Sequence, residues 1–335
     1  MSISISGSQI TFNDASVQNT AATGFGFKNR IINGAMNIWQ RGTTYALTTA
    51  ITYGSADRWN FWQGGVTASG IANQVASGLT GFQYAVKMGR NNGSALTGAI
   101  SAIQAAETNN SIDLAGQSIT LSFWAKAGAN FSATSSQIAS QVYSGTGTDQ
   151  SAASMGSWTN ATVVINGTPS ITTSWVKYSF TGTCASNVSQ VGVYITWTPT
   201  GTAGADDNLY ITGVQLEKGS TATSFDYRPY GTELALCQRY YWVVGRTASG
   251  GTSSTTQGDV CTSFPVAMRA APTATLINGT NALISPGTST TSVTSLNGTG
   301  GSTNGLVIYC VSSGLTATRP CYINADNFVG LSAEL

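Results

Sequence analysis

The sequence contains no histidine among its 335 residues. This absence excludes Ser-His-Asp and Cys-His catalysis and every metal site built on imidazole ligands. Neither a P-loop nor a dinucleotide-binding fingerprint occurs. The 13 carboxylates are few, and no local motif pairs two of them as a glycosidase requires. We therefore expect a protein that is not an enzyme.

Charge is scarce as well. Charged residues make up 8% of the chain, against about 25% in ordinary soluble domains. The formal net charge is +1 and the 14 basic residues form no run, so we do not expect a nucleic-acid partner. Because 10% of the residues are aromatic and 41% hydrophobic, the chain can bury a core. Its surface is then made of Ser, Thr, Asn, Gln and Gly, as in many extracellular fibres and sugar-binding proteins.

The sequence has no apolar run of about 20 residues, so no membrane insertion is expected. The first six residues alternate and do not form a charged and then apolar signal peptide. We therefore expect synthesis in the cytoplasm without a secretion signal. The five cysteines include no CxxC pair, which favours structural thiols over a disulfide framework. Whether Cys310 and Cys321 face each other across strands is left open.

Alternation of apolar and polar residues is the dominant pattern between residues 28 and 230. It is clear at 84–88, 119–124, 175–180, 191–197 and 208–214, with Gly-rich connections between them. This period of two predicts an antiparallel β-sandwich. Strand parity places Leu121 and Phe123 on the core face and Trp124 on the opposite face, beside Ser122 and Lys126.

The pattern changes after residue 230. Residues 232–243 predict a short helix, capped by Thr232 and ended by Gly245. Beyond it, strand-like islands at 260–264, 273–277, 305–311 and 321–323 predict a second, smaller β-domain. The low-complexity segment 288–301 is expected to be a loop. At the other end, residues 1–27 contain short alternating runs that cannot bury a core alone.

Two motifs carry a resemblance to a known family. They are Val214-Gln215-Leu216-Glu217-Lys218-Gly219 and Phe225-Asp226-Tyr227-Arg228-Pro229-Tyr230. Together with Asp57-Arg58-Trp59 and the segment 121–126, they resemble bacteriophage tail-fibre and receptor-binding virion proteins that carry a jelly roll like a carbohydrate-binding module. In this resemblance, residues 29–42 form the first strand of the jelly roll and the strap 219–230 leads to the helix.

The resemblance implies an organisation and a set of partners. Residues 1–27 are an attachment or oligomerisation segment, residues 28–230 the jelly roll, and residues 231–335 the helix and the C-terminal β-domain. The expected location is the virion, in a tail or surface appendage, with other virion tail proteins as neighbours. Because the N-terminal strands have nowhere to pair in a monomer, we expect a homotrimer.

A bacterial surface glycan is the expected ligand. Sugar C–H faces stack on flat aromatic rings, and hydroxyls pair with polar side chains. The candidate glycan-binding residues are Trp124, Lys126, Tyr194 and Trp62. Since the net charge is only +1, such binding is expected to be insensitive to salt.

No cofactor is expected, with the exception of one candidate calcium site. Asp206 and Asp207 precede a strand and offer hard oxygen ligands that suit Ca²⁺. The resemblance adds Asn33, because jelly-roll modules often hold a structural Ca²⁺ where the first and last strands meet. The other interpretation is turn chemistry, which Asp and Asn also favour.

Two other functions stay open at the level of sequence. One is a structural tail or head decoration or adaptor protein with no glycan ligand. The other is a polysaccharide depolymerase, since distant carboxylates can meet in a fold without any local motif.

Overall fold

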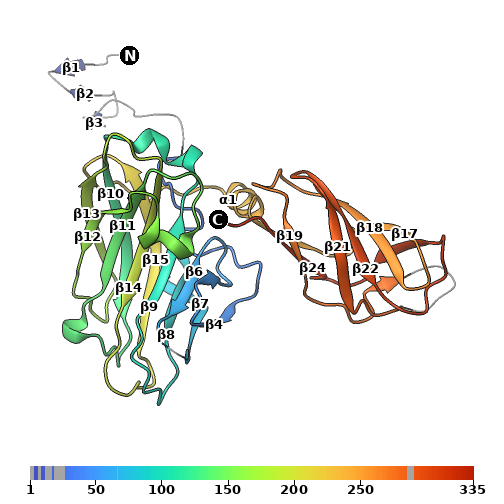
Figure 1. Cartoon of the computed structure of the whole chain (residues 1–335). Coiled ribbons are helices and arrows are strands. Elements are labelled where there is room, and N and C mark those ends of the chain that lie inside the picture. The colour runs from blue at the N-terminus through green and yellow to red at the C-terminus, as the bar shows by residue number, and fades with distance from the viewer. Residues whose placement is uncertain (1–3, 7–8, 12–16, 19–26, 66, 285–289) are drawn as a thin grey trace.

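The protein is almost entirely β-structure in its computed structural model (Figure 1). The structure describes all residues except 1–3, 7–8, 12–16, 19–26, 66 and 285–289. The larger part of the molecule is a β-sandwich of two six-stranded sheets, and a smaller β-region follows it beyond a short helix. The expected all-β fold, an antiparallel sandwich with a short helix, is confirmed.

The first sheet of the sandwich has the strand order β13-β10-β15-β8-β7-β4 and is antiparallel throughout. Its strands are β4 (Thr44–Ala46), β7 (Gly70–Leu79), β8 (Phe82–Arg90), β10 (Ser118–Ala127), β13 (Val176–Thr183) and β15 (Asn208–Lys218). Leu121 and Phe123 of β10 are fully buried in the core. Strand parity therefore turns Trp124 and Lys126 to the outer face, as the sequence predicts.

The second sheet has the order β12-β11-β14-β9-β6-β5 and is also antiparallel. Its strands are β5 (Thr52–Tyr53), β6 (Asn60–Gln63), β9 (Ile100–Ala105), β11 (Ala139–Gly145), β12 (Thr162–Gly167) and β14 (Gln190–Trp197). Val191, Val193 and Ile195 of β14 pack against the first sheet. Short 3-10 turns lie in the connections, namely η1 (Thr108–Asn110), η2 (Ile112–Leu114), η3 (Thr134–Ser136) and η4 (Ala152–Ser157).

A β-bulge in β15 adjusts which residues face the core. Both Ile211 and Val214 are buried there, although they are three positions apart. The register against β10 shifts at this point, because Gly213 adopts a left-handed φ of 62° that favours glycine. A Cβ at Gly213 would lie 2.6 Å from the Phe82 ring and 3.1 Å from the Trp124 ring. The bulge therefore lets two aromatic side chains approach the backbone.

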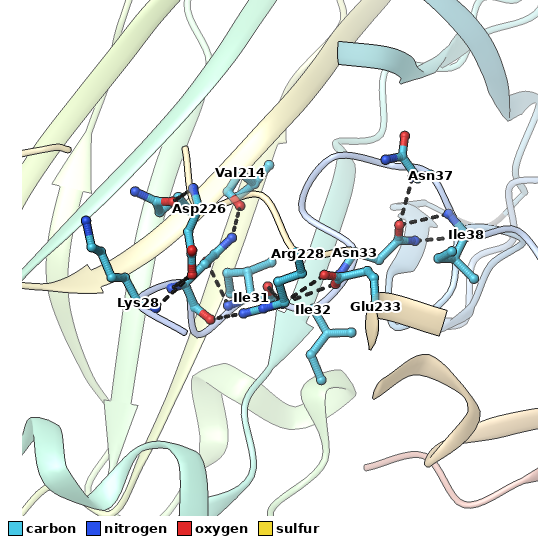
Figure 2. A network of polar contacts seen from close by, with 12 residues as sticks. Lys28, Ile31, Ile32, Asn33, Asn37, Ile38, Val214, Asp226, Arg228 and Glu233 are labelled. Carbon is cyan, nitrogen blue, oxygen red and sulfur yellow. Dashed lines mark hydrogen bonds and ion pairs between the residues drawn. The ribbon is translucent and has the colours of Figure 1, made fainter. Parts of the chain in front are cut away.

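The two motifs on which the family resemblance depends form one hydrogen-bonded unit (Figure 2). Gln215 accepts a hydrogen bond from the Asp226 N–H at 2.7 Å. Asp226 in turn accepts from the N–H groups of Lys28 and Asn29, at 2.7 and 3.1 Å. Arg228 pairs with Glu233 at 3.1 Å. The side chains of the strap thus connect β15, the last strand of the sandwich, to residues 28 and 29, where the sandwich begins.

The predicted first strand at 29–42 is wrong. This segment is a series of turns, in which Asn33 and Met36 both have a φ of 56°. The buried Asn33 side chain donates to the carbonyls of Ile38 and Asp57 at 2.9 and 3.1 Å and accepts from two backbone N–H groups. One side chain therefore satisfies backbone groups that a strand would pair with a neighbour.

The helix is shorter than predicted and begins earlier. Helix α1 spans Tyr230–Gln238, and its N-cap is Pro229 rather than Thr232. The residues expected to finish the helix instead form strand β16 (Tyr241–Val244), which pairs with β24 (Val329–Ser332). Aromatic and β-branched residues favour a paired strand once a partner is available. Gly245 therefore follows a strand, not a helix.

The smaller β-region contains two sheets around its own core, which includes Val260, Ile308 and Phe328. The three-stranded sheet is β16-β24-β19, and the six-stranded sheet is β20-β23-β17-β18-β22-β21. The strands not yet named are β17 (Ser249–Thr252), β18 (Gln257–Ser263), β19 (Thr273–Leu276), β20 (Leu283–Ile284), β21 (Ser295–Gly301), β22 (Gly305–Val311) and β23 (Pro320–Ile323).

The loop expected over 288–301 is wrong in its second half, because β21 pairs with β22 there. All five cysteines are free thiols, and β22 and β23, which carry Cys310 and Cys321, are not adjacent in their sheet. In the N-terminal segment, β1 (Ser4–Ser6), β2 (Gln9–Thr11) and β3 (Val17–Gln18) pair with one another. The division of the chain at residues 27 and 230 stays a prediction.

The end of the described chain returns to the sandwich beside α1 (Figure 1). Glu334 is nearly buried and forms ion pairs with Arg41, at 3.1 Å, and with Arg58. The guanidinium of Arg58 lies 3.6 Å from the ring centre of Tyr240, and that of Arg41 lies 3.5 Å from the ring centre of Tyr241. We call Arg41, Arg58, Tyr240, Tyr241 and Glu334 the tail clamp. It joins the sandwich to the smaller β-region through buried charges.

Candidate functional site

A row of aromatic and lysine side chains crosses the outer face of the first sheet. In the strand register, Lys126 of β10 stands opposite Tyr210 of β15, and Tyr210 stands opposite Lys87 of β8. Trp175 comes directly before β13 and continues the row past Lys126, because Ala125 stands opposite Val176. We call Trp175, Lys126, Tyr210 and Lys87 the aromatic–lysine row. Three strands and the residue before a fourth thus supply four side chains that the sequence separates by up to 123 positions.

The side chains of the row touch one another in order. The Lys126 ammonium nitrogen lies 5.2 Å from the ring centre of Trp175 and 4.8 Å from that of Tyr210. Lys87 lies 5.8 Å from the Tyr210 ring centre on its own side. These distances are in the range of cation–π attraction. All four side chains are half-buried, so the row is held in place but still reached by solvent.

Asp206 anchors one end of the row. Its Oδ1 accepts hydrogen bonds from the Tyr210 hydroxyl and the Asn208 amide, both at 2.8 Å, and its Oδ2 accepts from the Ala129 N–H at 3.1 Å. Lys87 lies 3.7 Å from Oδ1. Burial alone would raise the pKa of Asp206, but these hydrogen bonds and Lys87 outweigh it, so the pKa lies below its ordinary value. Asp206 is therefore an ionised carboxylate that fixes the Tyr210 ring.

Lys126 differs from its neighbours in the row. Within the described part of the chain, its ammonium group has no carboxylate within 4 Å and donates no hydrogen bond. It nevertheless carries three N–H donors. The two rings restrict where the ammonium group can lie. Lys126 therefore presents ordered donors toward solvent or a ligand.

Trp175, at one end of the row, and Trp124, outside it, connect the row to the β7–β8 hairpin. The Trp175 indole N–H donates to the carbonyl of Ser77 at 2.9 Å. Trp124 is half-buried, and its ring lies over Gly213 next to Phe82. Phe82 in turn contacts Phe225 and Tyr227 of the strap, at ring-centre distances of 5.1 and 5.5 Å. Part of the Trp124 ring is thus packed against the protein, so less of its surface is accessible to a sugar than in a fully exposed tryptophan.

The four predicted glycan-binding residues do not form one site. Trp124 and Lys126 lie on the outer face of the first sheet. Trp62 of β6 and Tyr194 of β14 belong to the second sheet, and their neighbours Phe61 and Val193 point into the core. They therefore lie on the opposite side of the sandwich, where the indole N–H of Trp62 donates to Thr49 and Tyr194 contacts Tyr143 edge-on.

Each of the three predicted calcium ligands is engaged by partners within the protein. Asp207 and Arg90 are both fully buried and form an ion pair, with the Arg90 Nε donating to Oδ2 at 2.8 Å. Asn33 is taken up by the backbone of its own turn. Asp206 holds Tyr210. In the described residues, no group of three Asp, Glu, Cys or His side chains gathers as a metal site. The guanidinium of Arg90 occupies the position beside the Asp207 carboxylate that a calcium ion bound by Asp207 would take.

Sequence reasoning missed Trp175, Tyr210 and Lys87. Two of them had a usable signal, because Tyr210 lies between the core residues Leu209 and Ile211 and Lys87 lies between Val86 and Met88. Parity alone therefore turns both outward. What the sequence does not contain is the register that places them beside Lys126.

Within the described ranges, no helix is long and apolar enough to cross a membrane.

Comparisons with known proteins give structural neighbours only. No family model and no curated protein matches the sequence. Among solved structures, the chain is similar to the enzymatically active domain of tailspike protein 4 of bacteriophage CBA120, with 16% identity and a TM-score of 0.36 over 57% of this chain and 21% of that one. It is also similar to a CBM22-1 xylan-binding domain of Paenibacillus barcinonensis, with 15% identity and a TM-score of 0.30 over 53% and 94%. A third is TmCBM61 in complex with β-1,4-galactotriose, with 12% identity and a TM-score of 0.33 over 57% and 99%.

Proposed function

We propose that this chain is a glycan-binding subunit of a phage virion appendage and that the aromatic–lysine row is its binding face. The observation that carries the proposal is Lys126, whose ammonium lies between the rings of Trp175 and Tyr210 and has no acceptor among the described residues. A sugar has an apolar C–H face and a rim of hydroxyls. The row offers the matching pair of features, namely aromatic rings and ordered donors.

The virion part of the proposal is supported by the sequence motifs of the strap. They resemble those of tail-fibre proteins, and in this chain they make specific contacts around Asp226 and Arg228. The N-terminal strands β1 to β3 form a sheet of their own. We propose that this sheet attaches the protein to other virion proteins and joins three copies, since the edge strands of an open sheet have unpaired backbone groups that can pair with another chain. Light scattering that found a monomer at micromolar concentration would contradict the trimer.

Binding of wild-type and variant protein to polysaccharide purified from a bacterial host surface tests the glycan proposal. Trp175→Ala is expected to weaken binding by about 1–3 kcal/mol, by analogy with the stacking of bases on aromatic side chains, or roughly 5- to 150-fold. Trp62→Ala is the matched control, because it removes an indole from the opposite face.

Equal losses for Trp175→Ala and Trp62→Ala would exclude the row as the binding face. If no host polysaccharide bound, the glycan function itself would be refuted. Melting curves of both variants separate loss of binding from loss of folding.

A further inference from the structure

Three lysines, Lys87, Lys126 and Lys177, project from the outer face of the first sheet. Two carboxylates also lie on this face: Asp206, beside Lys87, and the buried Glu217, which stands opposite Thr120 and binds Thr223. In the register of β10 and β13, Lys177 stands opposite Trp124. Both residues lie two positions along their strands from the row. Among the described residues, the carboxylate that contacts the row is Asp206, and its ion pair is with Lys87 at 3.7 Å.

Asp206 is poorly placed to neutralise Lys126 as well. Its Oδ1 already accepts from Tyr210 and Asn208 and lies near Lys87, and its Oδ2 accepts from the Ala129 N–H. Three of its four acceptor positions are therefore engaged, and in the described structure Asp206 forms an ion pair with Lys87 but none with Lys126. Lys177 is also without a carboxylate in the described structure, and its ammonium donates to the carbonyl of Thr223 at 2.8 Å. The face therefore has an unmatched positive charge centred on Lys126.

The position of Lys126 makes this charge effective. The group is half-buried, so salt screens it less than a fully exposed lysine. The rings of Trp175 and Tyr210 also hold it, which reduces the ordering that a ligand must impose. Charge-assisted hydrogen bonds to an anionic oxygen are stronger than those to a neutral hydroxyl.

We infer that the glycan recognised by the aromatic–lysine row carries an acidic group, a carboxylate or a phosphate, on the sugar unit that contacts Lys126. This inference rests on the proposed function and narrows its ligand class. Trp175 and Tyr210 contact the apolar faces of the sugar, and Lys126 between them pairs with the anion. It also reverses the expectation of salt-insensitive binding, because the local charge and not the net charge sets the salt dependence.

Calorimetric titration of the whole chain with three probes tests the inference. The probes are a neutral β-glucan oligosaccharide, a hexuronate oligosaccharide of similar length and a glycerol-phosphate polymer. At least one acidic probe is expected to bind roughly tenfold more tightly than the neutral one, and its affinity is expected to fall several-fold as salt is raised to about 0.15 M. The two acidic probes distinguish a carboxylate from a phosphate.

Variants assign this preference to Lys126. Lys126→Met should remove the preference for the acidic probe, Lys126→Arg should keep most of it, and Lys28→Met, which removes an exposed lysine outside the row, should have no effect. Equal affinity for neutral and acidic probes, or a preference that survives Lys126→Met, would overturn the inference while leaving glycan binding intact. If none of the probes binds, the result counts against the proposed function and the inference together. Unchanged melting temperatures show that the variants are folded.

Discussion

Cations lie against aromatic rings both in the tail clamp and in the aromatic–lysine row, and of these two regions only the row has the features of a binding site. In the tail clamp, Arg58 lies 3.6 Å from the ring centre of Tyr240 and also pairs with Glu334. In the aromatic–lysine row, Lys126 lies 4.8 Å from the ring centre of Tyr210 and pairs with no carboxylate of the described chain. The ring contact is common to both, so it does not by itself indicate function.

The difference lies in burial and in the donors left over. The Arg58 side chain is 1% exposed and Glu334 5%, so the clamp is closed to any ligand. Its second guanidinium, Arg41, contacts the same carboxylate. Lys126 is half-buried, with donors facing outward. A cation on a ring indicates a candidate site where it remains accessible and lacks a protein acceptor. The clamp, by contrast, holds two parts of the chain together.

The largest effect is expected from Glu334→Ala. Removing one partner of a buried ion pair leaves the other charge without compensation and typically costs about 3–5 kcal/mol. Here the buried Arg58 loses its carboxylate, and the half-buried Arg41 keeps, of the described carboxylates, only Asp57, at 4.0 Å. The free energy of unfolding, measured by denaturant titration, should fall by this amount. Glycan binding per folded molecule should not change.

Two comparisons sharpen that result. Glu334→Gln keeps the shape and isolates the charge, and it should lose most of the same stability. Lys126→Met should cost less than about 1 kcal/mol, because its ring contacts are partly exposed. If the costs of Glu334→Ala and Lys126→Met were equal, the contrast between a closed and an open cluster would be refuted.

The next effect is a pH dependence at Asp57, which borders the clamp. Burial raises the pKa of Asp57 to about 6 from an ordinary 3.8, although Arg41 and hydrogen bonds from Gln40 partly oppose the rise. The charge of Glu334 raises the pKa of Asp57 further. Burial and, after it, the charge of Asp57 raise the pKa of the Cys237 thiol. The folded state therefore holds the Asp57 proton more tightly than the unfolded state. The resulting stability is fully present below about pH 4 and is lost as the pH rises through about 6.

Asp57→Asn removes this titration. The wild type should lose about 3 kcal/mol of stability relative to the variant between about pH 4 and pH 7. Denaturant titrations of both proteins at several pH values measure the difference. A difference that stayed constant with pH would show that Asp57 titrates normally.

Trp124 tests the border between packing and recognition. Its ring is half-buried over Gly213 and beside Phe82. Trp124→Ala should therefore cost about 2 kcal/mol of stability, roughly half of the 3–5 kcal/mol for a fully buried aromatic. Its effect on glycan binding should be smaller than that of Trp175→Ala. A melting curve beside a binding curve decides, and a large binding loss with no change in stability would make Trp124 a stacking platform.

Local alternation in the sequence predicts most of the strands and the outward direction of Trp124 and Lys126. It fails where a side chain replaces a backbone partner, as Asn33 does in the segment expected to be the first strand. It also fails at Tyr241, where a strand distant in sequence converts an expected helix end into β16. Strand parity predicts which side chains of one strand point outward, but it does not predict to which sheet that strand belongs. The sequence therefore does not separate Trp62 and Tyr194, in the second sheet, from Trp124, in the first.

The row itself depends on long-range register. Lys126 meets Tyr210 across 84 positions of sequence, beside the bulge at Gly213 that shifts the pairing. The sequence of neither strand by itself predicts that pairing register. The same holds for Asp207, whose partner Arg90 lies 117 positions away. Local sequence indicates oxygen ligands at Asp207 but not the cation that already occupies them.

The smallest effects come from the same change made on the two faces, Tyr194→Phe and Tyr210→Phe. The Tyr194 hydroxyl accepts a hydrogen bond from Ser101 at 3.0 Å, and Ser101 can donate to Thr196 at 2.8 Å instead. Its loss should cost less than about 1 kcal/mol of stability and leave glycan binding unchanged.

Tyr210→Phe removes the hydroxyl that holds Asp206. The pKa of Asp206 should then rise, because a hydrogen bond that favours the ionised form is gone. The ring of the row becomes less constrained, so glycan binding should weaken by a few-fold, about 1 kcal/mol. Carboxylate titration by NMR and one binding curve per variant measure both effects. If Tyr194→Phe weakened binding as much as Tyr210→Phe, the two faces would contribute equally to binding, and the proposal that the aromatic–lysine row is the binding site would be refuted.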